Sequence, residues 1–256
     1  MVEVTFPKIG EKHKLTPLFT AEHTMKNEPK IPKKVIFIYS NSLEDKLKDV
    51  IKLSRSKFRL GEGGAWRAYN LITKNKDIII VKLPSGAPFT AAAMEEAIFL
   101  GGNQFLIIGA AGGIKENISI SDIVLCTKAI RDEGTSHHYI KSSKYAFPDK
   151  SLTKKIEVAL SKNKIEFHKG TSWTTDAPYV ETIEEIKHYR KEGVITVEME
   201  ASALFAVAKR RGVRAAAVFT VSDVLGREWS GFMDNDYKNN GYKKLARIAK
   251  LFNEMK

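Results

Sequence analysis

The stretch VITVEMEASALFAVAKRRGVRAAAVFTVSD, residues 194–223, decides the fold of this chain. It begins with a short apolar run at 194–197, continues with a helical segment at 198–212, and ends with a second apolar run at 214–223. Short apolar runs on either side of a helix predict buried strands joined by a helix, as in parallel sheets. The stretch therefore predicts an α/β protein.

The same alternation continues through most of the chain. The expected strands are residues 34–40, 65–73, 77–86, 103–114, 122–134 and the first part of 166–182. The expected further helices are residues 42–54, 89–102, 150–163, 183–193 and 242–256. The pattern predicts one α/β domain with a mixed, mostly parallel central sheet and helices on both faces. Residues 1–34 are expected to form an N-terminal arm ahead of a domain at 35–256, and such an arm needs a surface to lie on, for example a neighbouring subunit.

Composition narrows the class of protein. The formal net charge is +12, but the lysines are scattered and not interleaved with aromatics, which favours solvated faces over nucleic-acid binding. No apolar run approaches the roughly 18 residues of a membrane helix, and the N-terminus lacks the apolar core of a signal peptide. The single cysteine, Cys126, excludes an internal disulfide and fits a reducing compartment. We therefore expect a cytoplasmic protein without nucleic-acid or membrane partners.

Distinctive residues follow several predicted strands. Glu198 and Glu200 follow one apolar run and Asp223 ends another, while GAAGG at 109–113 and PSGAP at 84–88 follow two more. In sheets of this kind, ligands bind at the carboxyl ends of the strands. A glutamate at a helix start is also favoured by the helix dipole, so each one alone has an ordinary structural explanation. Together with Asp223, they favour a ligand site at this edge.

Several segments, in this order along the chain, resemble the nucleoside phosphorylase family, which includes bacterial-type purine nucleoside phosphorylase and uridine phosphorylase. They are LPSGAPFTAAAMEEA at 83–97, AIRDEGTSHHY at 129–139, TSWTTDAPY at 171–179, VEMEAS at 197–202 and FTVSD at 219–223. The resemblance extends from about residue 34 to the C-terminus, and VEMEAS is its most specific motif. It implies a divergent, uridine-phosphorylase-like member of the family.

The resemblance implies roles for the carboxylates. Glu200 would hold the ribose hydroxyls with Glu198 beside it, and Met199 would pack on the sugar. A carboxylate there stabilises the oxocarbenium-like sugar that forms as the glycosidic bond breaks. Asp223 would protonate a purine at N7 as the base leaves, a general-acid role that needs a raised pKa. Arg227 is expected to support Asp223.

The resemblance also implies a base site and a residue from a second subunit. The base-binding loop would supply Trp173, Thr174 and Asp176, with Trp173 stacking on the base; a core or interface position is the alternative for this tryptophan. In the family a histidine from a neighbouring subunit's N-terminal region contacts the sugar, and His23 fits this role better than His13. The family forms dimers that often associate into hexamers, so a homodimer or a trimer of dimers is expected.

The phosphate site departs from the family pattern. The glycine–aspartate–arginine loop after the first strand is replaced by residues 40–42, and the expected strand arginine aligns with Ile107. The usual hydroxyl aligns with Ala110. A glycine-rich turn at a strand end still offers backbone N–H groups to an anion. The expected phosphate contacts are therefore Ser85, Gly86, Gly109, Ala110 and Arg131.

Arg131 is the preferred cation among the candidates Arg59, Arg67, Lys82 and Arg131, and a structural ion pair with Asp132 or Glu133 is its alternative. Without a cation in the pocket, water could replace phosphate, as in the related nucleosidases. Those enzymes need a further glutamate, for which only Glu22 and Glu44 are weak candidates. A non-catalytic nucleoside-binding protein is another alternative.

The base preference is mixed. Asp223 favours a purine, whereas segments 129–139 and 171–179 look closer to the uridine branch, so purine is preferred and uridine second. No cofactor is expected beyond inorganic phosphate as co-substrate. No metal is expected either, because His137 and His138 would point to opposite faces of an extended segment.

Overall fold

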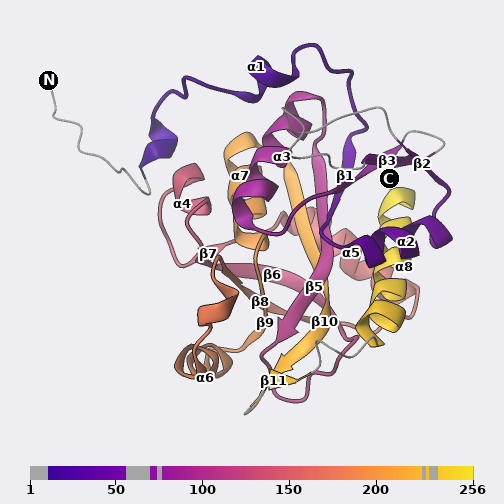
Figure 1. The fold of residues 1–256 in the computed structure, drawn as a ribbon, viewed down its shortest axis with the longest axis vertical. Helices are drawn as coiled ribbons and strands as arrows, with labels where there is room; N and C mark the ends of the chain where they lie inside the picture. Colours follow the sequence, from indigo (N-terminus) through magenta and orange to yellow (C-terminus); the bar gives the residue numbers. More distant parts are fainter. Residues whose placement is uncertain (1–10, 56–69, 74–76, 227–228, 231–235, 256) are drawn as a thin grey trace, which may run out of the picture.

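Buried apolar strands form the centre of the fold (Figure 1). The computed structural model describes residues 11–55, 70–73, 77–226, 229–230 and 236–255. The long strand β5 (Gln104–Gly113) pairs in parallel with β1 (Lys34–Ile38) on one side and β10 (Arg214–Leu225) on the other. Strand β4 (Ile78–Lys82) pairs in parallel with β1. The parallel arrangement buries these strands on both faces, as their continuous apolar sequences require.

The sheet closes into a ring on one side. From β10 the pairing passes through β6 (Ile123–Asp132), β8 (His168–Thr175) and β9 (Val194–Glu198) and returns to β5, which itself pairs with β10. Gly112 of β5 therefore lies opposite Val197 of β9 and also opposite Asp223 of β10. Ring closure thus brings the two carboxylate-bearing strand ends to neighbouring positions.

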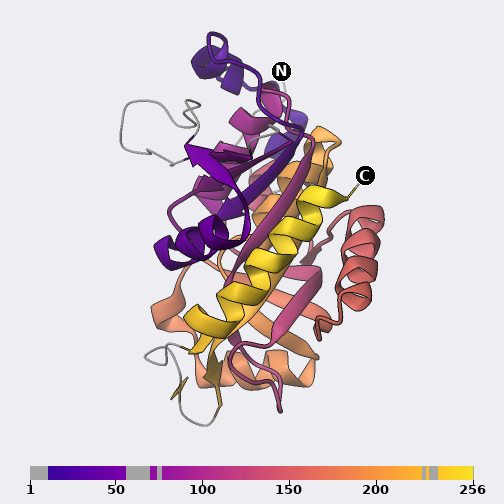
Figure 2. The same cartoon turned by 90° about the vertical axis from the view of Figure 1, so that its right-hand side faces the viewer.

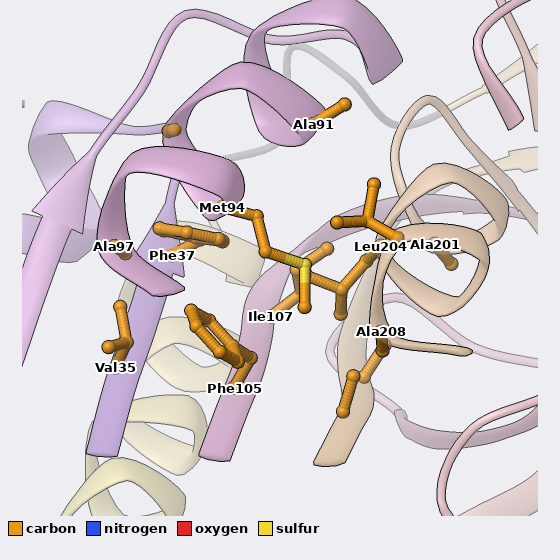
Figure 3. Close-up of a cluster of buried hydrophobic side chains, with 14 of the residues drawn as sticks. Val35, Phe37, Ala91, Met94, Ala97, Phe105, Ile107, Ala201, Leu204 and Ala208 are labelled. Atoms are coloured by element: carbon orange, nitrogen blue, oxygen red, sulfur yellow. The ribbon is translucent and has the colours of Figure 1, made fainter. Parts of the chain in front are cut away.

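Helices cover both faces of the sheet, which confirms the predicted fold class. On one face α3 (Ala87–Phe99) packs against α7 (Ala201–Arg211), and Met94 of α3 points toward Leu204 of α7 over Ile107 (Figure 3). On the other face lie α2 (Asn41–Val50), α5 (Lys150–Lys162) and α8 (Tyr242–Glu254), the last running along the sheet in Figure 2. The remaining elements are η1 (Lys12–Lys14), α1 (Ala21–Met25), α4 (Ser136–Tyr139), β7 (Tyr145–Ala146), η2 (Pro178–Val180), α6 (Ile183–Lys191), β11 (Trp229–Ser230) and the π-helical turn η3 (Tyr237–Gly241).

Some predicted boundaries were wrong. The helix predicted at 42–54 ends at Val50, because the chain turns extended at Ile51 and forms β2 (Leu53–Arg55), which pairs with β3 (Asn70–Thr73). The strand predicted at 77–86 ends at Lys82 and leaves a loop before α3. Only 70–73 of the strand predicted at 65–73 falls within the described residues.

The described part of the N-terminal segment lies along the body over α3 (Figure 1). The N–H of Ile31 donates to the carbonyl of Leu100 at 3.0 Å, and Met25 is buried in the core. Leu18 and Phe19, by contrast, are 95% and 68% exposed. Across the described ranges, every helix is too short or too polar to cross a membrane.

Candidate functional site

The site lies at an opening in the edge of β5. On the side of β5 away from β10, β1 pairs with it as far as Ile107 and β9 pairs with it at Gly112 and Gly113. Between these pairings no described strand covers residues 108–111. The ends of β1 and β9 face each other across this opening, so Tyr39 and the glutamates after β9 flank it.

Glu200 is buried at the start of α7 and reaches the loop after β4. Its Oε1 accepts the N–H of Gly86 at 2.7 Å, and its Oε2 accepts the N–H of Met199 at 3.3 Å. Gly86 has φ of 119°, a backbone conformation that glycine adopts without strain. The structure therefore joins the PSGAP loop to Glu200, the second glutamate of VEMEAS, through the Gly86 N–H. The sequence did not predict this contact.

The pKa of Glu200 is raised to about 8, chiefly by burial and then by the charge of Glu198, while the two backbone N–H groups act in the opposite direction. At neutral pH the protonated form therefore predominates. A ligand that donates hydrogen bonds to Glu200 would favour the ionised form.

Glu198 is committed to the protein itself. Its Oε1 accepts the hydroxyls of Ser172 at 3.0 Å and Thr174 at 2.6 Å, and its Oε2 accepts the N–H groups of Glu200 and Ala201, both at 2.7 Å. A carboxylate has about four acceptor sites, so these donors fill it. Glu198, expected at the ribose, and Thr174, expected at the base, thus bond to each other and to the first N–H groups of α7, and together they fix the start of that helix.

The other residues predicted to bind the base are also structural. Trp173 is 1% exposed, donates its Nε1–H to Asp132 at 2.8 Å, and packs 4.7 Å from the ring of Tyr189. The core alternative for Trp173 is therefore the correct one. Asp176 accepts the N–H of Gly134 at 2.9 Å and so ties two loops together.

Asp223 is directed by an irregularity in β10. The pairing with β5 shifts register between Val221 and Asp223, and such bulges re-aim a side chain. Its Oδ1 accepts the hydroxyl of Ser222 at 2.6 Å and its Oδ2 accepts the indole N–H of Trp229 at 2.9 Å. A Cβ on Gly112 would lie 2.6 Å from Leu225 Cδ1, so the glycine leaves room for this leucine of β10 beside β5.

Glu181 is a second carboxylate near Asp223 that the sequence did not identify. It is half-buried just after η2, and its pKa is raised to about 7, chiefly by burial and then by the charges of Asp223 and Glu185. Glu181 lies two residues after the end of the TSWTTDAPY segment, and this position is the sequence feature that could have identified it as a site residue.

Tyr39 and Thr90 are further site residues that the sequence did not identify. The Tyr39 hydroxyl is hydrogen-bonded to Thr90 Oγ1 at 2.8 Å. Burial raises the pKa of Tyr39 well above its usual value, and the nearby charge of Glu200 raises it further. A Cβ on Gly109 would lie 3.6 Å from the Tyr39 ring, which places this tyrosine at the opening. Tyr39 follows β1 directly, at the same edge as the other strand ends, and this position could have identified it as a site residue.

The GAAGG segment is not the predicted turn. Gly109 and Ala110 continue β5 and lie opposite Phe219 and Thr220 of β10. Both nevertheless fall within the opening at 108–111, where β5 has no strand on its other side. The predicted nest of backbone N–H groups is therefore replaced by a stretch of β5 that has no described strand paired on this side.

Arg131, which was predicted to bind phosphate, donates to groups of the protein itself. It is 5% exposed, and its guanidinium donates to the hydroxyls of Ser136 at 2.8 Å and Ser143 at 3.0 Å and to the carbonyls of Lys141 at 2.8 Å and Ile140 at 3.4 Å. These bonds hold the loop around α4 and leave little of the guanidinium for a ligand.

Lys82 lies at the end of β4, beside the end of β1. Its ammonium donates to Asn41 Oδ1 and lies 3.9 Å from Glu44, both in the first turn of α2. Lys82 therefore stands where the family's phosphate loop would be. The other cation candidates, Arg59 and Arg67, lie outside the described residues, as does Arg227.

The remaining predicted residues are not drawn together. Ser85 is exposed in the loop before α3. His23 is exposed on α1, where its Nδ1 lies 3.1 Å from Thr20 Oγ1 and its ring 5.5 Å from that of Phe19. Among the residues that the structure describes, no group of three His, Cys, Asp or Glu side chains could hold a metal ion.

Comparison with known proteins points in one direction. The model of the family described as "Phosphorylase superfamily" matches residues 35–255. A guanosine phosphorylase from Halorubrum lacusprofundi is 29% identical over 190 residues, which cover 72% of this chain and 79% of that protein. A DeoD-type purine nucleoside phosphorylase from Clostridium novyi is 30% identical over 227 residues, covering 86% and 90%. A crystal structure of uridine phosphorylase from Vibrio fischeri superposes with a TM-score of 0.74 at 26% identity, covering 88% of this chain and 93% of that one.

Proposed function

This chain belongs to the phosphorylase superfamily, and we propose that it cleaves the N-glycosidic bond of a nucleoside with inorganic phosphate, giving the free base and ribose 1-phosphate. The observation that carries the proposal is the arrangement at the β5 opening: Glu200 retains free acceptor sites on one side, and Asp223 lies across β5 from the end of β9. The names of the similar proteins support the same reaction class.

Glu200 would bind the sugar. Its two internal donors leave about two acceptor sites, enough for the 2′ and 3′ hydroxyls of a ribose. Ionised Glu200 then stabilises the positive charge that develops on the sugar as the bond from C1′ to the base breaks. Met199, half-buried beside it, would pack on the sugar ring.

Phosphate would bind between Lys82 and the part of β5 at 108–111 that lacks a paired strand on this side. Lys82 offers charge, and the first turn of α2 offers its N-terminal dipole. A phosphate oxygen would form the new bond to C1′ while the base takes up the bonding electrons. Gly109 and Ala110 would contact phosphate through their backbone, in line with their position in the opening.

A purine is the preferred base, with uridine second. A protonated Asp223 can donate to N7 of a leaving purine, which a pyrimidine lacks. The relatives named for guanosine and for purine nucleosides are consistent with this preference. We also propose a homodimer or a trimer of dimers, since Leu18 and Phe19 of the arm are exposed apolar side chains that a second copy would cover.

The test is release of base from inosine, guanosine, adenosine and uridine, with and without phosphate, followed by chromatography. Release that requires phosphate and yields ribose 1-phosphate is expected. Release without phosphate would instead indicate a nucleosidase, for which Glu44 beside Lys82 is the candidate base. Binding without release from any nucleoside would refute both enzymatic proposals.

A further inference from the structure

We propose that a cavity beside the start of α8 binds a phosphate monoester of a small hydrophilic molecule. The cavity has a volume of about 380 Å³ and lies between the turn at 120–121 and the continuous helical segment formed by η3 and α8. This volume is within the range of about 300–1,000 Å³ that is usual for small-molecule sites. The inference does not rest on the proposed reaction, because none of the residues placed at the β5 opening lines this cavity.

Three cations from one face of α8 line the cavity. Lys243 and Arg247 are about one helical turn apart, and Lys244 lies beside them. Like charges at this spacing weaken a helix, so the arrangement has a cost that a bound anion would remove. Neither Lys243 nor Arg247 forms an ion pair with a described carboxylate, so both are available to an anion.

A run of cations on a helix is ordinarily a solvated face, but this one faces a fixed polar wall. Lys244 Nζ donates to the carbonyl of Ser121 at 2.9 Å, and the Ser121 hydroxyl donates to Asp236 Oδ2 at 2.6 Å. Asn240 Nδ2 donates to the other oxygen of Asp236 at 2.5 Å. These bonds tie the turn, in which Ser121 is 4% exposed, to η3 and α8. The walls of the cavity are thus held in place before a ligand binds, which lowers the cost of binding.

The lining selects the class of ligand. Three cations and one carboxylate give the cavity an excess of positive charge, which favours a dianion. Arg247 carries a planar fork that matches two phosphate oxygens, and Lys243 adds a point charge. Asn240 and Ser121 carry side-chain oxygens that can accept from hydroxyl groups. Among the described residues that line the cavity none is aromatic, so a base would find no ring to stack on, and a sugar phosphate is favoured over a nucleotide.

The test measures binding by isothermal titration calorimetry in wild type, Lys243→Gln, Arg247→Gln and the matched control Lys250→Gln. Lys250 is an exposed cation of the same helix that does not line the cavity. The ligands are ribose 5-phosphate, inosine 5′-monophosphate and inorganic phosphate. The variants at Lys243 and Arg247 should each raise Kd for ribose 5-phosphate about tenfold, because each removes a charge-assisted contact. The control should change it by less than about twofold.

Lys82→Gln separates this cavity from the phosphate position proposed at β5, and it should leave the binding of ribose 5-phosphate unchanged. Weaker binding in K82Q alone would place the ligand at β5 and overturn the proposal. Equal affinity in all variants, an equal loss in K250Q, or no binding of either monoester to wild type would also overturn it.

The three ligands test the assignment to a monoester. Either monoester should bind more tightly than inorganic phosphate, and the reverse order would refute the assignment. The tighter of the two identifies the source, with ribose 5-phosphate expected because the lining lacks an aromatic ring. Failure of base release would refute the proposed reaction and would leave each of these binding results as it stands.

Discussion

Replacing Glu200 by glutamine should make the protein more stable at alkaline pH and less active. The pKa of Glu200 in the folded protein is about 8, above the ordinary 4.5. The fold therefore favours the neutral carboxyl, and the stability it contributes is present below pH 4.5 and lost as the pH rises through about 8. At roughly 1.4 kcal/mol per pKa unit, ionised Glu200 costs wild type about 5 kcal/mol at pH 9.

Glu200→Gln removes this cost and retains an acceptor for the Gly86 N–H at 2.7 Å. It loses an acceptor toward the Met199 N–H, worth about 1 kcal/mol. The variant should thus be slightly less stable than wild type at pH 4.5 and a few kcal/mol more stable at pH 9. Urea unfolding at both pH values measures the difference.

Two ribose hydroxyls that lose an ionised acceptor should cost about 2–4 kcal/mol of transition-state stabilisation, so kcat/KM should fall by about 30- to 1000-fold. Gain of stability with loss of activity marks a residue kept for function. A stability difference that is the same at pH 4.5 and pH 9 would refute the reasoning about burial. Unchanged turnover would refute the role in ribose binding.

Three other substitutions test the remaining roles. Asp223→Asn keeps one acceptor oxygen for the Trp229 indole, and the Ser222 hydroxyl can turn to accept from the new NH₂. The amide cannot act as the general acid, so kcat for inosine should fall by about 10²–10⁴-fold while the melting temperature hardly moves; activity near wild type would exclude the acid role. Glu198→Gln places an amide NH₂ against either the hydroxyl donors or the backbone donors, because glutamine has only one acceptor oxygen. The free energy of unfolding in urea should therefore fall by about 2–4 kcal/mol. A decrease below about 1 kcal/mol would contradict the structural role of Glu198. Lys82→Gln should raise KM for phosphate about tenfold and leave KM for the nucleoside almost unchanged, and an equal rise in both would place Lys82 outside the phosphate site.

The sequence predicted the sheet and the position of the site because both follow from local patterns. Apolar runs identified β1, β4, β5 and β10, and the polar residues after them indicated the edge where Gly86 and Glu200 meet. The closing of β5 on β10 and β9 was not predictable, because pairing partners depend on contacts distant in sequence. For the same reason GAAGG was expected to turn, although β10 holds it extended.

Individual side chains were harder to assign than segments. Trp173 and Thr174 belong to a motif that resembles a base-binding loop, yet alternation along β8 gives no indication of which partners they have across the ring. Their burial against Asp132 and Glu198 appears only once β6, β8 and β9 are assembled. Arg131 is similar: its donors meet loop carbonyls whose position is set by tertiary folding.

The carboxylates at the two strand ends differ in how many of their acceptor sites the protein itself fills. Glu198 receives two hydroxyls and two backbone N–H groups, so a ligand could approach it only by breaking the start of α7. Glu200 receives only two backbone N–H groups and is buried, so its remaining acceptors are costly to leave empty and are matched by a ligand rich in hydroxyls. Asp223 accepts the hydroxyl of the neighbouring Ser222 and the indole N–H of Trp229, one on each carboxylate oxygen. The first glutamate therefore builds the site, whereas the proposed roles of sugar binding and proton transfer fall to Glu200 and Asp223.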